Sequence, residues 1–127
     1  MKILSLLTRA AIGAPFVFLG YDAVKEPGMR VKMATDFGVP EEYGELAVRA
    51  NGAAMVLGGL SVITGLLPRL GAAAVVASMI PTTLAGHSFW NDTDPKQRKT
   101  NTIQFLKNVG MVGGLLAVAA APKPSKD

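Results

Sequence analysis

The chain offers few side chains that could carry out chemistry, because it contains no cysteine and a single histidine. Without cysteine it has no thiolate nucleophile, no disulfide and no Cys-ligated zinc or iron–sulfur site. His87 has no second imidazole for a bis-His haem site, and the nearby Asp92 and Asp94 belong to a polar loop, so we predict no metal site. Because an imidazole titrates near neutral pH, His87 could handle protons or hydrogen-bond a quinone. The competing hypothesis makes His87, close to Trp90, an anchor at a membrane interface.

The elements that must position these residues follow from where charge is missing. No charged residue occurs in positions 50–68 or 70–91, and two shorter charge-free stretches cover 10–21 and 108–122. A helix needs roughly 20 mostly apolar residues to cross the hydrocarbon core. The shorter stretches qualify if Arg9 and Lys107 lie near helix ends and extend their charges to the interface. We therefore predict membrane spans over residues 3–23, 44–67, 70–89 and 103–121.

A soluble four-helix bundle is the alternative fold. Its surface helices would show a polar stripe with a period of 3.6 residues. The stretches 57–67 and 70–80 are instead apolar on all sides. The predicted fold class is thus all-α, a transmembrane four-helix bundle that occupies residues 1–121, with residues 122–127 as a disordered tail.

Three local patterns describe how the spans are packed and joined. Small residues four apart allow helices to approach closely in lipid, and the positions we select for such packing are Ala54, Gly58, Gly110 and Gly114. Pro68 and Arg69 leave little room for a loop, which predicts a tight helical hairpin. Met29, Met33 and Phe37 recur at a spacing of four, which predicts a short amphipathic helix at the membrane surface between the first two spans.

Threading the chain up and down gathers most polar span residues near one end. Both termini fall on one side of the membrane, called side A here, and the first and third loops fall on side B. Asn51 begins the second span at side B, His87 and Trp90 end the third there, and Lys107 and Asn108 begin the fourth. Asn51 and Asn108 could each orient His87 or bridge the second and fourth spans. We interpret Trp90 and Lys107 as interfacial anchors, and the orientation of the two sides stays open.

Several short motifs follow one another in order along residues 9–116, nearly the whole chain. They are Arg9, the stretch 20–25 (GYDAVK), 38–40 (GVP), Gly58-Gly59 followed by Gly65, 86–90 (GHSFW), 105–108 (FLKN) and 113–116 (GGLL). This ordered set resembles the DoxX family, and the stretch 81–87 (PTTLAGH) together with 105–108 is most similar to its actinobacterial branch.

The resemblance implies a four-helix, multi-pass protein of the bacterial plasma membrane. It also implies a link with quinone-coupled sulfur oxidation and with membrane-associated redox assemblies. The resemblance carries over four positions as quinone- or proton-handling candidates: Arg9, Lys25, His87 and Asn108. Asn51 is a fifth candidate, at a position where this chain departs from the family pattern. Many family members have a glutamate where this chain has Asn51, which puts proton chemistry in doubt.

Two functional hypotheses follow. The first is an accessory membrane subunit of a redox or respiratory assembly, with a pocket for a quinone or a bound lipid at side B. The second is a component of a quinone-linked oxidoreductase, with His87 and Asn108 at the quinone head. Because the chain has no redox centre of its own, electrons would need a bound quinone or a partner subunit, which favours the first hypothesis over an enzyme. The expected partners are membrane lipids and other membrane-protein subunits, with no nucleic acid, since the basic residues flank the spans and suit anionic headgroups.

Overall fold

A computed structural model describes residues 2–122 of the chain, so most of the predicted tail lies outside the described residues. Four long α-helices and one short one make up this part of the chain. They are α1 (Lys2–Lys25), α2 (Met29–Phe37), α3 (Gly44–Thr64), α4 (Pro68–Gly86) and α5 (Pro95–Ala120). All four long helices have the length and apolar composition needed to cross a membrane. The predicted all-α architecture, with four spans and a short helix after the first, is confirmed.

Local sequence signals explain where the helices begin and end. Gly65 ends α3 with a φ of 77°, a left-handed conformation that glycine adopts without steric cost, and Pro68 opens α4. The hairpin between α3 and α4 is therefore as tight as the sequence predicts. Asp94 caps α5 by accepting a hydrogen bond from the Lys96 amide (3.3 Å). As a result α5 begins eight residues before the predicted span, because its first turns are polar but still good helix formers.

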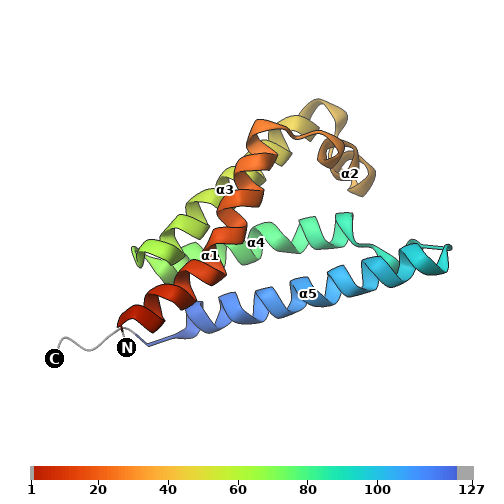
Figure 1. Cartoon of the computed structure of the whole chain (residues 1–127). Coiled ribbons are helices and arrows are strands. Elements are labelled where there is room, and N and C mark those ends of the chain that lie inside the picture. Colours follow the sequence, from red (N-terminus) through yellow and green to blue (C-terminus); the bar gives the residue numbers. More distant parts are fainter. Residues whose placement is uncertain (1, 123–127) are drawn as a thin grey trace.

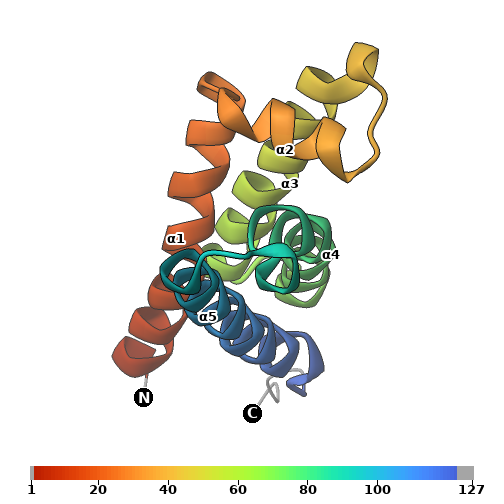
Figure 2. The ribbon, with the colours of Figure 1, turned by 90° about the vertical axis from the view of Figure 1, so that its right-hand side faces the viewer.

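The long helices are arranged as two antiparallel pairs. Helix α1 lies beside α3, and α4 lies beside α5 (Figure 1). The pairs meet at the end that carries the start of α1, the end of α5 and the α3–α4 turn, which is side A, and they diverge toward side B (Figures 1 and 2). Helix α2 crosses the side B end of α3 and packs on both α3 and α4. A cavity lined by α1, α2, α3 and α4 lies at this diverging end.

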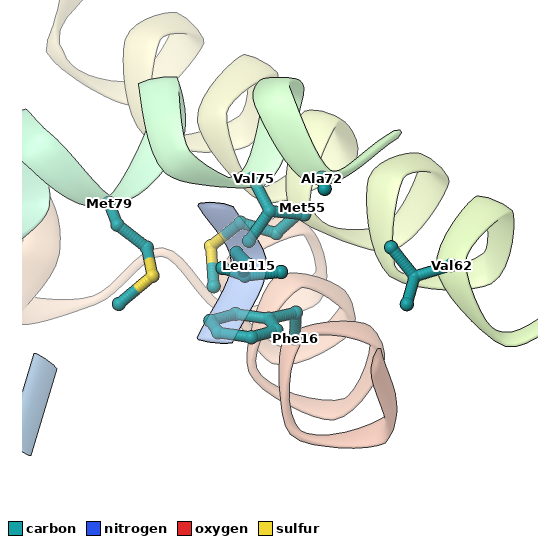
Figure 3. Close-up of a cluster of buried hydrophobic side chains, with 7 residues drawn as sticks. All are labelled: Phe16, Met55, Val62, Ala72, Val75, Met79 and Leu115. Atoms are coloured by element: carbon teal, nitrogen blue, oxygen red, sulfur yellow. The ribbon is translucent and has the colours of Figure 1, made fainter. Parts of the chain in front are cut away.

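A small apolar core joins all four long helices where the pairs meet. Its buried members are Phe16 of α1, Met55 and Val62 of α3, Ala72, Val75 and Met79 of α4, and Leu115 of α5 (Figure 3). Val62, Val75 and Leu115 have no exposed surface. Interiors of this kind are closely packed, so this core holds the two pairs in a defined relation.

Pairs of facing glycines bring α1 and α3 into backbone contact at two levels. A Cβ added at Gly13 would lie 2.7 Å from the carbonyl oxygen of Gly59, and one added at Gly59 would lie 2.8 Å from that of Gly13. Gly20 and Gly52 face each other in the same way, at 2.5 and 2.7 Å. The members of each pair are seven residues apart on their helix, two turns along one face. In lipid, where close packing drives helix association, these crossings fix α1 on α3.

The four small residues selected from the sequence divide into two groups. Gly58 lies at the α3–α4 crossing, where an added Cβ would lie 2.7 Å from the Gly71 carbonyl oxygen, and Ala54 is half-buried on the same helix. Gly110 and Gly114 lie elsewhere: a Cβ on either would meet nothing within 4 Å among the described residues. They line a groove of about 410 Å³ between α1 and α5, because α5 diverges from α1 and packs mainly on α4. Within residues 2–122, no helix is therefore packed against these two glycines.

Candidate functional site

A cavity of about 650 Å³ lies at the side B end, enclosed by α1, α2, α3 and α4. Its wall is apolar apart from four side chains, which are Arg30, Asn51, Thr82 and His87. Binding sites for small molecules commonly measure 300–1,000 Å³ and combine an apolar wall with a few polar groups. The cavity has the size and composition of such a site.

Helix α2 forms the outer wall of the cavity. Met29, Met33 and Phe37 line it, although these side chains are also 70%, 42% and 50% exposed. The sequence predicts these residues at a membrane surface, and the structure shows that the same apolar stripe faces the cavity. A short helix with one apolar face can serve both purposes at the edge of a bundle.

Contacts at the start and along the inner side of α2 hold this helix over the cavity. At its start, Arg30 forms an ion pair with Asp22 of α1 (2.8 Å) and donates to the Glu26 carbonyl oxygen (3.2 Å). On its inner side, Val31 and Thr35 pack on Gly44, where an added Cβ would lie 3.0 and 3.1 Å from their methyl groups. The ion pair is half-exposed and therefore weak, so the packing of α2 on Gly44 and the apolar contacts of its inner face attach α2 to the bundle more strongly than the ion pair does.

A hydrogen-bond chain at the cavity wall connects α3 with α4. Asn51 donates from Nδ2 to the Thr82 hydroxyl (3.0 Å), and Thr82 donates to the Ser78 carbonyl oxygen (2.8 Å). The buried Ser78 hydroxyl donates in turn to the Asn51 carbonyl oxygen (3.4 Å). Asn51 thus faces the cavity from a position fixed by α4.

A second chain holds His87, which caps the C-terminal end of α4 and is half-buried at the cavity wall. Its Nδ1 lies 3.5 Å from Oδ1 of Asn101, and Nδ2 of Asn101 donates to the Asp92 carboxylate (2.7 Å). Sequence analysis missed Asn101. Its spacing of seven from Asn108 places both on one face of α5, and this periodicity could have revealed it.

The remaining candidates lie away from the cavity. Asn108 donates to the Thr83 hydroxyl (2.9 Å) and so joins α5 to α4 rather than touching His87. Lys25 is exposed at the last residue of α1. Arg9 lies at the side A end, with its guanidinium against Gly65, where a cation favours the C-terminal end of α3. Of the five candidates, the structure brings only Asn51 and His87 into one cavity.

The two expected anchors have separate surroundings. Trp90 is 49% exposed and packs edge to face with Phe89 and Phe105, at ring centroid distances of 5.2 and 6.0 Å. Lys107 is exposed and borders the groove between α1 and α5. The aromatic cluster packs the 3-10 turn Phe89–Asn91 against Phe105 of α5. This contact fixes the position of the loop that follows His87.

Comparison with known proteins places the chain in a family. A family model described as DoxX matches residues 4–88, about two thirds of the chain. The chain belongs to the DoxX family. As a DoxX protein it is a multi-pass membrane protein with four candidate spans. The match includes Asn51 and His87 and ends before α5, so Asn101 and Asn108 lie beyond it. No curated protein and no solved structure matches the chain.

Proposed function

We propose that this DoxX protein is an accessory subunit of a membrane-associated redox or respiratory assembly in the bacterial plasma membrane. Its role there is to hold a quinone, or a lipid of similar shape, in the cavity beneath α2. The observation that carries the proposal is the cavity of about 650 Å³ with Asn51 and His87 in an otherwise nearly apolar wall.

The chemistry of a quinone suits this wall. A quinone combines a long apolar tail with a ring that carries two polar oxygens. Leu19, Met55 and Pro81 supply apolar surface, whereas Asn51 and His87 supply groups that can orient the ring. Because the chain has no cysteine, its electrons would travel on the bound quinone or on a partner subunit.

The alternative, an oxidoreductase component with His87 and Asn108 at the quinone head, has less support. Asn108 gives its amide hydrogen to Thr83 and is absent from the cavity wall. In our proposal Asn51, and not Asn108, is the asparagine at the quinone head. A carrier of quinone beside a partner's redox centre agrees better with these positions than an enzyme acting alone.

The test is purification of the tagged full chain in a mild detergent, followed by mass spectrometry of proteins and solvent-extractable quinones. We expect stoichiometric membrane-protein partners and close to one quinone per chain. Ala85→Phe fills the cavity from α4, and the matched control Ala77→Phe adds the same bulk on the exposed side of that helix. The proposal requires that only Ala85→Phe loses the quinone. Recovery of a lone chain without partners, or equal quinone in both variants, would contradict it.

A further inference from the structure

Thr82 and Asn51, two of the four polar side chains of the cavity wall, donate hydrogen bonds within the protein. Thr82 donates its only hydroxyl hydrogen to the Ser78 carbonyl oxygen, so it can only accept from Asn51. This fixes the amide of Asn51 with Nδ2 toward Thr82, and Nδ2 also lies 3.9 Å from the Met55 sulfur, a weak acceptor. Oδ1, the acceptor end of the amide, is the part of Asn51 that is left for a ligand.

The hydrogen bonds of Asn101 determine which ring nitrogen of His87 carries a hydrogen. The carboxylate of Asp92 can only accept, so the amide of Asn101 must direct Nδ2 toward it and present Oδ1 to His87. An amide oxygen accepts but does not donate, so Nδ1 of His87 must carry a hydrogen. Asn101 is not part of the cavity wall, and the other ring nitrogen, Nε2, is therefore the one available to a ligand there. In the neutral imidazole Nε2 has a lone pair and accepts a hydrogen bond.

We propose that the cavity is a hydrogen-bond-accepting site that selects a reduced quinol over the oxidised quinone, and that Asn101 and Asp92 are the positioning residues that set this selectivity. The two hydroxyls of a quinol donate to Oδ1 of Asn51 and Nε2 of His87, whereas the carbonyl oxygens of a quinone meet two acceptors. Arg30, the fourth polar residue of the wall, directs one N–H group of each terminal nitrogen to Asp22 and to the Glu26 carbonyl oxygen, so the two wall groups closest in chemistry to a ligand's hydroxyls are Asn51 and His87. This inference rests on the proposed function, because it names the redox form of the proposed ligand.

The single histidine allows a direct test of the positioning role. The ¹⁵N spectrum of the ligand-free full chain, taken at the alkaline limit of a pH series, reports which ring nitrogen carries the hydrogen. We expect a protonated Nδ1 and an unprotonated Nε2. Asn101→Leu removes the acceptor and should shift the ring toward the form protonated at Nε2, which a histidine side chain favours in water. The control Asp94→Asn makes a charge change in the same loop, retains a good helix cap and should leave the spectrum unchanged. A wild-type ring protonated at Nε2 would overturn the inference whether or not Asn101→Leu folds.

Ligand selectivity is measured by anaerobic equilibrium binding of tetramethyl-p-benzoquinone and its dithionite-reduced quinol to the solubilised chain. We expect the quinol to bind roughly tenfold more tightly, because the quinone leaves two half-buried acceptors without a donor. In Asn101→Leu this preference should disappear, and in Asp94→Asn it should persist. Binding of both forms with equal affinity, or a preference for the quinone, would overturn the inference while leaving a quinone cavity in place. Binding of neither form would overturn the ligand assignment together with the proposed function.

Discussion

Replacing one glycine at the α1–α3 crossing should destabilise the protein more than replacing a glycine of the same kind on α5. In Gly52→Ala the new Cβ lies 2.7 Å from the Gly20 carbonyl oxygen and 3.0 Å from the Ala23 Cβ, and the nearer atom is backbone that cannot rotate away. In Gly110→Ala the new Cβ meets nothing within 4 Å. The two substitutions make the same chemical change in a helix, so their difference isolates the crossing.

The expected magnitude follows from the distance that the helices must move. To bring the contact from 2.7 Å to the 3.4 Å of ordinary van der Waals contact, α1 and α3 must separate by about 0.7 Å. A gap of that size forfeits a quarter to a half of each dispersion contact, which is worth roughly 0.1–0.2 kcal/mol per atom pair. Over a few tens of pairs, the free energy of unfolding should fall by about 1–3 kcal/mol, as for other overpacked sites. Gly110→Ala should leave it unchanged or raise it by up to about 1 kcal/mol.

The assay is SDS-induced unfolding in mixed micelles, followed by helical circular dichroism and by the fluorescence of Trp90, the single tryptophan. The double variant Gly20→Ala/Gly52→Ala should lose less free energy of unfolding than the sum of the two single variants. The separation of α1 from α3 that the first methyl group causes already makes room for the second. Equal stability of Gly52→Ala and Gly110→Ala would refute the backbone contact between α1 and α3.

Two further predictions concern the polar ties. Asp22→Asn removes the charged partner of Arg30 and should increase amide hydrogen exchange across residues 29–37; the effect should be on the order of 1 kcal/mol or less, because the pair is half-exposed. The control Asp36→Asn breaks a pair within α2 and should not increase exchange in this way. Equal exchange in both variants would contradict the role of the Arg30–Asp22 pair in holding α2 on α1. A double-mutant cycle of Asn108→Leu and Thr83→Val should give a coupling of about 0.6–2 kcal/mol in SDS unfolding, and strictly additive effects would show that the bond between α4 and α5 contributes nothing.

The membrane spans could be predicted because charge is excluded from them regardless of their neighbours. The tight turn beside Pro68 could also be predicted, although α4 begins at Pro68 itself and not at residue 70. The start of α5 at Pro95, eight residues before the predicted span, could not. Hydropathy marks what lies in lipid, and it gives no signal for helical turns that continue into water.

Helix pairing could be predicted only in kind. Glycine spacing indicates close packing but does not tell which face meets which neighbour, so Gly58 lies at a crossing while Gly110 faces a groove. The pairs of Gly13 with Gly59 and Gly20 with Gly52 depend on the register between two helices. That register is a tertiary property, and no local pattern in either helix states it.

The location of the candidate site could be predicted from the sequence, whereas its hydrogen-bond partners could not. The polar layer at side B could be predicted from topology, which places Asn51 and His87 at one end of the bundle. The partners of these residues could not, because hydrogen bonds between helices depend on rotation about each helix axis. Asn101 lies in the polar start of α5, where only its spacing of seven from Asn108 distinguishes it, and its Oδ1 lies 3.5 Å from Nδ1 of His87.

Photolabelling with an azido-quinone shows whether a quinone is held beneath α2. The purified full chain is irradiated with the probe, digested and sequenced by mass spectrometry, with and without excess unlabelled quinol. We expect label on residues 29–39 and 81–87, which contribute to the cavity wall, and loss of that label under competition and in Ala85→Phe. Label spread over the exposed face of α5, or label that excess quinol does not displace, would contradict it.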